Sequence, residues 1–196
     1  MSIPVIAFFN NKGGVGKTSL VYHVAWMLSD LGWRVVATDL DPQSNLSAAF
    51  LDDDRLDELW SSTKDAATIY HAVRSLERGI GDIVQPNLEI IEDNLALIPG
   101  DMALSGFEDE LSDVWPKCLD RQERAFRIMS AFWRVMQAGA VKHRAKVILV
   151  DLGPNLGAIN RAALIASDHV IVPLAPDLFS LQGLRNLGPR LSDWRK

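Results

Sequence analysis

Residues 5–18 of the chain read VIAFFNNKGGVGKT, and this stretch decides the fold. The run from Val5 to Phe9 is apolar and rich in strand formers, and glycines follow it at positions 13, 14 and 16. From Lys17 to about Asp30 the apolar residues recur at helical spacing, and Gly32 is a suitable helix terminator. The segment therefore predicts a strand, a glycine-rich loop and a helix, in that order.

The same alternation of strand and helix returns along the chain. Residues 34–40 are predicted as the next strand, and their apolar run at 35–37 suits a strand buried on both faces. Later segments repeat the pattern, namely a strand at 147–150, a helix at 156–166, a strand at 170–173 and a final helix at 178–194 in which Gly188-Pro189 could cause a break. Strands that alternate with helices favour an α/β fold, with a mostly parallel sheet and helices on both faces.

The middle of the chain is less regular. It contains a short helical stretch at 69–76 and two short strand candidates at 88–91 and 95–98. Residues 121–138 carry apolar side chains at helical spacing, and we predict one long helix there with its apolar stripe in the core. Since no linker, repeat or low-complexity tract interrupts the pattern, we expect one domain over residues 1–196.

Composition excludes several classes of function. The chain has one cysteine, Cys118, so an internal disulfide framework and a thiolate-ligated zinc or iron–sulfur site are impossible. The net charge is −5, which disfavours nucleic-acid binding through the whole surface. Because the N-terminus lacks the features of a signal peptide and no apolar run could span a bilayer, we expect a cytoplasmic protein.

The glycine loop has the parts of a phosphate-binding site. A loop between a strand and a helix can aim backbone N–H groups at an anion, and the helix N-terminus adds partial positive charge. Glycines let the backbone approach the anion closely. Lys17 supplies a positive charge for the outer phosphates, and Thr18 supplies a hydroxyl for Mg²⁺.

The loop departs from the common pattern G-x-x-x-x-G-K-[ST] because Asn11 stands at its first glycine and a second lysine, Lys12, follows. Residues 12–19, KGGVGKTS, resemble the deviant Walker A motif of the ParA/MinD superfamily of P-loop ATPases. The acids of ATDLDPQ at residues 37–43 and the acid that ends the strand at 147–151 resemble two further motifs of that superfamily. Residues 95–108 are more similar to ParA-type chains than to MinD-type ones, and the resemblance extends from Val5 to about Leu184.

The resemblance implies a Mg·ATP-driven switch in which ATP stabilises a homodimer and hydrolysis releases it. It implies that Thr18 binds Mg²⁺ and that Asp39 and Asp151 hold the water molecules around the metal. Lys17 would stabilise phosphate charge, Asp41 would orient the attacking water, and Lys12 would reach the nucleotide of the partner subunit. The nucleotide-binding residues implied in this way are Lys12, Gly13, Gly14, Val15, Gly16, Lys17, Thr18, Ser19 and, from the adenine-contacting region at 173–177, Pro176.

Two segments depart from the superfamily pattern. After Asp151 the chain reads LGPN, which keeps only Pro154 of the usual proline pair. The chain also stops at Lys196, where similar chains continue, so the C-terminal part is expected to be shortened and to leave a sheet edge unpaired. We see no amphipathic membrane anchor. A ParB-like or other adaptor protein is the expected partner, and non-specific DNA binding through the basic residues of the last helix stays open, these being Arg185, Arg190, Arg195 and Lys196.

Two alternatives to the partitioning switch remain at this point. One is a scaffold that binds a nucleotide without hydrolysing it, which the altered segment after Asp151 favours and the intact lysines and acids disfavour. The other is a metabolic enzyme on the same fold, such as a small-molecule ligase, which would not need Lys12 in a partner's site. Fold alone cannot choose between them.

Overall fold

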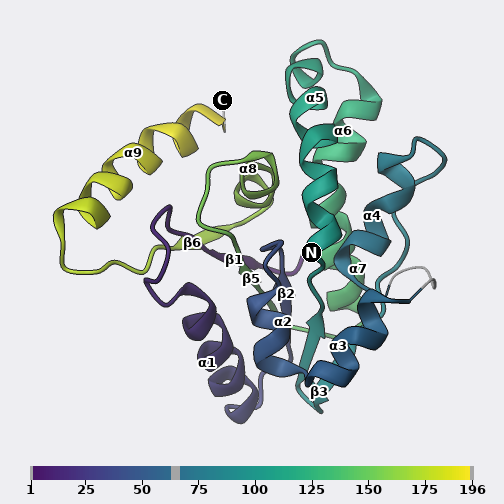
Figure 1. Ribbon diagram of the computed structural model, residues 1–196, viewed down its shortest axis with the longest axis vertical. Coiled ribbons are helices and arrows are strands. Elements are labelled where there is room, and N and C mark those ends of the chain that lie inside the picture. Colours follow the sequence, from purple (N-terminus) through teal and green to yellow (C-terminus); the bar gives the residue numbers. More distant parts are fainter. Residues whose placement is uncertain (1, 63–66, 195–196) are drawn as a thin grey trace.

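The computed structural model describes residues 2–62 and 67–194. Within these residues a six-stranded sheet has the order β3-β4-β2-β5-β1-β6 (Figure 1). Only β3 and β4 run antiparallel, which confirms the mostly parallel sheet. The strands are β1 Val5–Phe8, β2 Val35–Asp39, β3 Glu89–Glu92, β4 Leu95–Ile98, β5 Val147–Asp151 and β6 His169–Ile171.

The central strands divide their side chains between two hydrophobic cores, because successive residues of a strand point to opposite faces of the sheet. In β2, Val36 belongs to the core on one face, whereas Val35 and Ala37 belong to the core on the other. The same alternation holds along β4 and β5, and every residue of these three strands is buried. Their continuous apolar runs therefore reflect burial on both faces.

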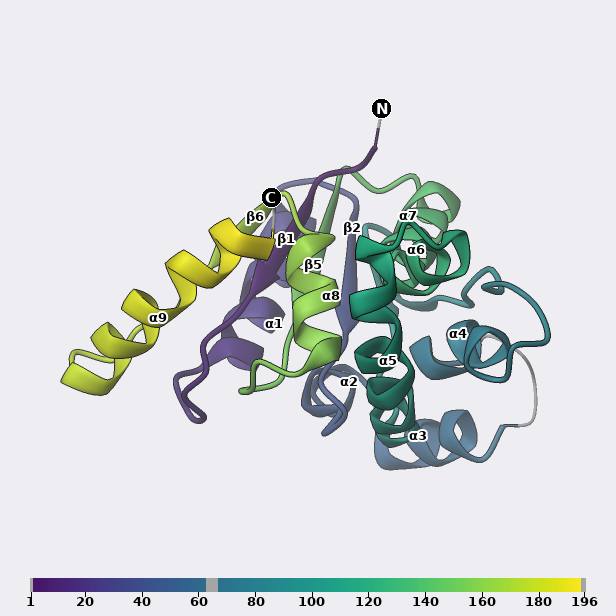
Figure 2. The ribbon, with the colours of Figure 1, turned by 90° about the horizontal axis from the view of Figure 1, so that it is seen from above.

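Helices cover both faces of the sheet, as the sequence predicts (Figure 2). The smaller core is closed by α1 (Lys17–Asp30) and α2 (Asn45–Phe50), and the larger core contains residues of α4, α5, α6, α7, α8 and α9. The remaining helices are α3 Asp53–Trp60, α4 Ile69–Glu77, α5 Phe107–Leu119, α6 Glu123–Met129, α7 Ala131–His143, α8 Ala158–Ile165 and α9 Leu178–Trp194, with a 3₁₀ helix, η1, at Met102–Gly106.

Several predicted boundaries are confirmed. Helix α1 has the predicted bounds, and Gly32 beyond its end adopts φ of 80°, a left-handed conformation that glycine enters without steric cost. Helix α9 is continuous through Gly188-Pro189. Strand β6 lies at one edge of the sheet and pairs only with β1 among the described residues. No helix in the described part of the chain is long and apolar enough to cross a bilayer.

The single helix predicted over residues 121–138 is wrong. The structure has two helices, α6 and α7, that meet at Ser130, where the backbone leaves helical dihedral angles with ψ of 2°. The hydroxyl of Ser130 donates to the carbonyl oxygen of Arg127 at 3.4 Å, a local bond of the kind that competes with helical pairing. The apolar pattern gives no sign of this break, because both helices face the same core. The residues of the pattern that are buried in this core are Ala125, Ile128, Phe132, Val135 and Met136.

The core beneath α5 and α7 contains an aromatic pair. Phe132 is 1% exposed, and its ring meets that of Phe107 edge to face with centroids 5.7 Å apart. We expect Phe132→Ala to lower the free energy of unfolding by about 3–5 kcal/mol, since it leaves a cavity in the core. Denaturant unfolding measures this value. Trp133→Ala is the matched control, since Trp133 is 38% exposed on the same helix, and an equal loss in both variants would contradict the prediction.

Candidate functional site

The glycine loop joins β1 to α1 at the carboxyl end of the sheet. Gly14 and Gly16 adopt φ of 73° and 79°, which residues with a Cβ rarely do. Asn10 fixes the start of the loop, since its side chain donates to the carbonyl oxygen of Pro173 at 2.7 Å and accepts from the backbone N–H of Lys12 at 2.9 Å. The loop is therefore held to the segment that follows β6.

A cavity of about 570 Å³ opens in front of this loop. Its walls come from the loop, from the first turns of α1 and from the segment after β2. The lining residues are Gly13, Gly14, Gly16, Lys17, Thr18, Ser19, Tyr22, His23, Asp41, Gln43, Asn45, Ala49 and Pro154. Six residues of the predicted nucleotide-binding set thus share one wall of the cavity.

Lys17 lies at the first position of α1 and is only 7% exposed. Burial lowers the pKa of its ammonium group, and the carboxylates of Asp151 and Asp41 act in the opposite direction. A buried ammonium group beside an open cavity is a strong site for an anion, because few water molecules compete for its charge. The position fits the predicted role of Lys17 toward the outer phosphates.

Thr18 and Asp151 meet behind the loop. The hydroxyl of Thr18 donates to Oδ2 of Asp151 at 2.6 Å, and Oδ1 of Asp151 is buried without a hydrogen-bond partner. Burial raises the pKa of Asp151 to about 6, while the bond from Thr18 acts against this rise. A hydroxyl and a carboxylate with a free buried oxygen suit Mg²⁺, which takes one or two protein ligands together with phosphate and water oxygens. The described residues hold no group of three or more His, Cys, Asp or Glu side chains that could bind a metal by themselves.

Asp39 is in register with Asp151 on the neighbouring strand, but its carboxylate does not line the cavity. Ser47 donates to Oδ2 from both its backbone N–H and its hydroxyl, each at 2.8 Å, and the backbone N–H of Asp41 donates to Oδ1 at 3.2 Å. Complete burial raises the pKa of Asp39 to about 7, and the charge of Asp151 adds to the rise. The role of Asp39 toward the water shell of the metal stays a prediction.

Asp41 lies at the wall of the cavity and is 7% exposed. Its Oδ1 accepts the backbone N–H of Gln43 at 3.0 Å. Gly153, just after β5, lies so close that a Cβ there would be 3.2 Å from this oxygen. Asp41 is thus held between two segments at the carboxyl ends of β2 and β5, where it can reach a water molecule in the cavity.

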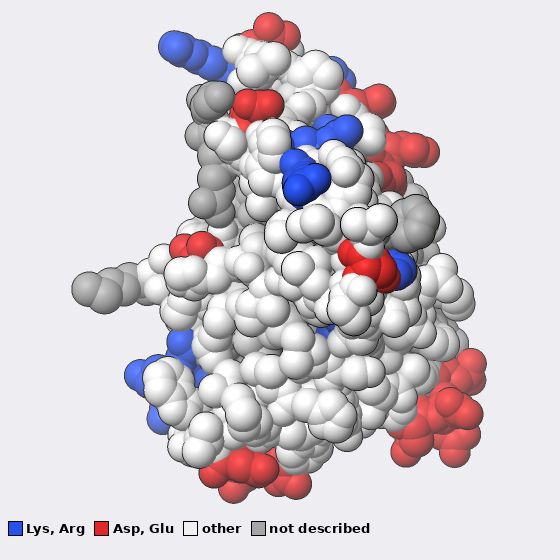
Figure 3. Space-filling view, turned by 90° about the vertical axis from the view of Figure 1, so that its left-hand side faces the viewer, with Lys and Arg blue, Asp and Glu red and all other residues white. Residues whose placement is uncertain are grey.

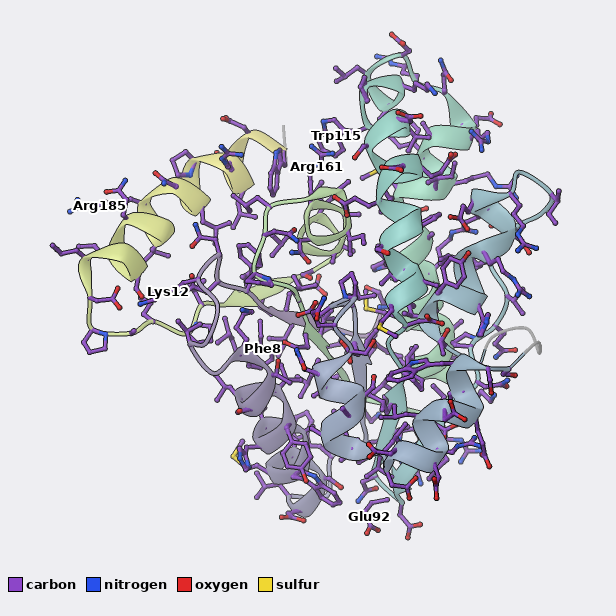
Figure 4. The ribbon with its side chains drawn as sticks, in the orientation of Figure 1. Phe8, Lys12, Glu92, Trp115, Arg161 and Arg185 are labelled. Atoms are coloured by element: carbon purple, nitrogen blue, oxygen red, sulfur yellow. The ribbon has the colours of Figure 1, made fainter. Side chains whose placement is uncertain are left out.

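The predicted residues Lys12, Val15 and Pro176 do not line the cavity. Lys12 extends toward the C-terminal segment, and its ammonium group forms an ion pair with Asp177 at the start of α9 (Figure 4). The Lys12 side chain is 38% exposed. Pro176, which precedes Asp177 in the sequence, is exposed. Their roles at the nucleotide stay predictions, and the structure gives Lys12 a partner within its own chain.

Several residues of the site were missed by sequence reasoning, among them Tyr22, His23 and Ser47. Tyr22 and His23 line the cavity from the second turn of α1, with ring centroids 5.3 Å apart. Helical spacing carries a signal for them, because Tyr22 and His23 lie four positions after Thr18 and Ser19 and so face the same side of the helix as these residues. Ser47 holds Asp39 from α2, a short helix that the sequence pattern does not reveal.

These features define a P-loop nucleotide-binding domain of the deviant Walker A kind. A family model described as AAA domain matches residues 3–196. The chain is 31% identical over 183 residues to the chromosome partitioning protein ParA of Caulobacter vibrioides, a match that covers 93% of this chain and 60% of ParA. The chain belongs to the ParA/MinD family of P-loop ATPases.

Two solved structures extend the comparison. A protein from Corynebacterium diphtheriae is 33% identical with a TM-score of 0.83, over 98% of this chain and 64% of that one. Cobyrinic acid a,c-diamide synthase from Mycobacterium smegmatis, with bound ADP and magnesium, is 27% identical with a TM-score of 0.68, over 97% of this chain and 67% of that one. The chain spans about three fifths of the length of the curated relatives that it matches.

The buried acids predict how stability depends on pH. The pKa of Asp39 is about 7 in the folded protein, above its ordinary value of 3.8, so the folded state holds the extra proton between these values. The contribution of Asp39 to the free energy of unfolding is complete below pH 3.8 and is lost as pH rises through about 7. Asp151→Asn removes the neighbouring charge and should make this loss smaller.

Denaturant unfolding of the ligand-free protein across this pH range measures the effect. The matched control is Asp93→Asn, an exposed acid in the turn between β3 and β4. The control should keep the slope of the parent protein. A slope unchanged by Asp151→Asn would show that the two carboxylates are not coupled.

Proposed function

We propose that this domain binds Mg·ATP, dimerises around it and hydrolyses it, and that it works as a partitioning or positioning switch. The observation that carries the proposal is the buried ammonium group of Lys17 next to the bonded pair of Thr18 and Asp151, at one cavity. The relative with bound ADP and magnesium and the relative named as a chromosome partitioning protein support it. A partitioning role would place the chain in the cytoplasm.

The site supports phosphoryl transfer by positioning and charge neutralisation. Backbone N–H groups of the glycine loop and the ammonium group of Lys17 would bind the phosphates. Thr18 and Asp151 would hold Mg²⁺, which supplies charge neutralisation at the transferred phosphoryl group. Asp41, at the wall of the same cavity, would accept a hydrogen bond from the attacking water and orient it.

Lys12 is the residue that would join two subunits. Its side chain is partly exposed and is paired with Asp177, so it can exchange this partner for the phosphates in a second copy of the chain. Each nucleotide would then contact both subunits, and its binding energy would favour the dimer by mass action. An adaptor protein that stimulates hydrolysis is part of the proposal.

Non-specific DNA binding would depend on how positive charge is distributed over the surface. On the face shown in Figure 3 most of the surface is uncharged, and the basic side chains drawn there lie in small separate groups. Arg185 projects from α9, at the far side from α5 (Figure 4), and Arg195 and Lys196 lie outside the described residues. A DNA contact would therefore need a partner or a second copy to assemble enough positive charge.

A small-molecule ligase is the second candidate, and the similarity to the diamide synthase favours it. Such an enzyme needs the same phosphate site, but it does not need Lys12 in the site of another subunit. The two functions therefore differ in how the rate depends on protein concentration.

The deciding experiment measures Mg·ATP hydrolysis per protomer over a wide range of protein concentration. A switch predicts a rate per protomer that rises with concentration and is lost in Lys12→Ala, while that variant still binds ATP. Lys117→Ala, an exposed lysine on α5, is the matched control and should behave as the parent protein. Turnover that is independent of concentration and of Lys12 would favour the ligase, and ATP binding without turnover would favour the scaffold.

Variants of Lys17 and Asp41 test nucleotide binding and ATP hydrolysis separately. Lys17→Ala should weaken ATP binding by at least about tenfold, because a charged hydrogen-bond donor to the phosphates is lost. Asp41→Ala should still bind ATP and accumulate as a dimer that does not hydrolyse it. Calorimetry and size-exclusion chromatography with ATP measure the two effects, and an Asp41→Ala variant with parental turnover would remove Asp41 from the mechanism.

A further inference from the structure

Glu108, in the first turn of α5, contacts the N-terminus of α8. Its carboxylate accepts the backbone N–H groups of Ala158 and of Ile159, the latter at 2.9 Å. Helix α8 has no capping side chain of its own, because its N-cap residue is Gly157. Glu108 therefore satisfies two N–H groups that lack partners within the helix, and its charge suits the positive end of the helix dipole.

The contact between the two segments is closely fitted. A Cβ on Gly157 would lie 2.3 Å from Oε1 of Glu108, so any larger residue there would displace the carboxylate from its present position. Seven residues along α5, the ring of Trp115 lies 4.3 Å from the guanidinium carbon of Arg161 on α8 (Figure 4). Residues seven apart share one face of a helix. One face of α5 thus holds α8 at two points, through a carboxylate and through a cation–π contact.

Helix α8 in turn holds the segment that leaves β5. The side-chain amide of Asn160, which is 2% exposed, donates to the carbonyl oxygens of Gly153 at 2.9 Å and of Asn155 at 2.7 Å. Gly153 lies against the carboxylate of Asp41, and Pro154 lines the cavity. An unbroken series of contacts therefore leads from Glu108 to the wall of the nucleotide site.

We propose that Glu108 is a positioning residue for ATP hydrolysis, acting through α8 and residues 153–155 on Asp41. This inference rests on the proposed hydrolysis and adds a residue outside the cavity to it. Glu108 does not touch the nucleotide site. Its loss would let residues 153–155 shift, and displacing a reacting group by about 1 Å can cost about 100-fold in rate.

The test compares Glu108→Gln with Glu110→Gln. The first keeps the size of the side chain but turns an acceptor oxygen into an N–H₂ group that faces N–H donors. The second removes a charge from the same helix, where Glu110 pairs with Arg124 at the surface. We expect kcat to fall by about 10- to 100-fold in Glu108→Gln only, with the affinity for ATP changed less than about threefold and the unfolding midpoint lowered by about 2–4 °C, because the cap of α8 is weakened.

Two further variants and a hydrogen-exchange measurement test the series of contacts between Glu108 and Asp41. Gly157→Ala crowds the same contact from the other side and should give the same loss of kcat. Asn160→Ala should also lower kcat, and its effect should not add to that of Glu108→Gln, because both act on the same segment. Amide hydrogen exchange should become faster at residues 153–159 in Glu108→Gln and not in Glu110→Gln.

The outcomes separate this inference from the proposed function. A parent protein that does not hydrolyse ATP overturns both. A parent protein that hydrolyses ATP, with Glu108→Gln turning over at the same rate, overturns only the role of Glu108. Additive losses in the double variant, or unchanged hydrogen exchange at residues 153–159, would overturn the route through α8.

Discussion

Negative charge crowded at the carboxyl ends of β2 and β5 is the constraint on which the site depends. Asp39 and Asp151 are in register on neighbouring strands and are fully buried, and Asp41 lies two residues beyond the first. Burial raises the pKa of Asp39 to about 7 and that of Asp151 to about 6, and a neighbouring carboxylate adds to each rise, Asp151 for Asp39 and Asp41 for Asp151. Lys17 is the buried cation that partly balances them.

Such a site favours the binding of a cation. A magnesium ion beside the free oxygen of Asp151 would stabilise the ionised form of that carboxylate and relieve the repulsion. These carboxylates repel one another when ionised, and the rest of the structure keeps them in place. The two cores around β2 and β5 fix the strands, and α8 fixes the segment that follows β5.

Sequence alone predicts the part of this arrangement that is local. The strand, loop and first helix follow from the spacing of glycines and apolar residues, and the parallel sheet follows from the alternation of strands with helices. Thr18 and Asp151 could be assigned to one Mg²⁺ site before the structure only because their motifs resemble those of the ParA/MinD superfamily. The break at Ser130 could not be predicted, since both helices around it continue one apolar stripe into one core. The contacts of Glu108 with α8 and of Lys12 with Asp177 join residues 50 and 165 positions apart, and no local pattern encodes such pairs.

One small cluster around Asp39 has a consequence for how the sequence can change over time. The hydroxyl of Ser47 donates to Asp39 and accepts the backbone N–H of Gly100 at 2.7 Å, and a Cβ on Gly100 would come within 2.8 Å of the Asp39 carboxyl carbon. Substitution of any one of these three residues is therefore disfavoured while the other two are unchanged. Positions 39, 47 and 100 are therefore expected to covary in the evolution of such chains, so that they change together or not at all.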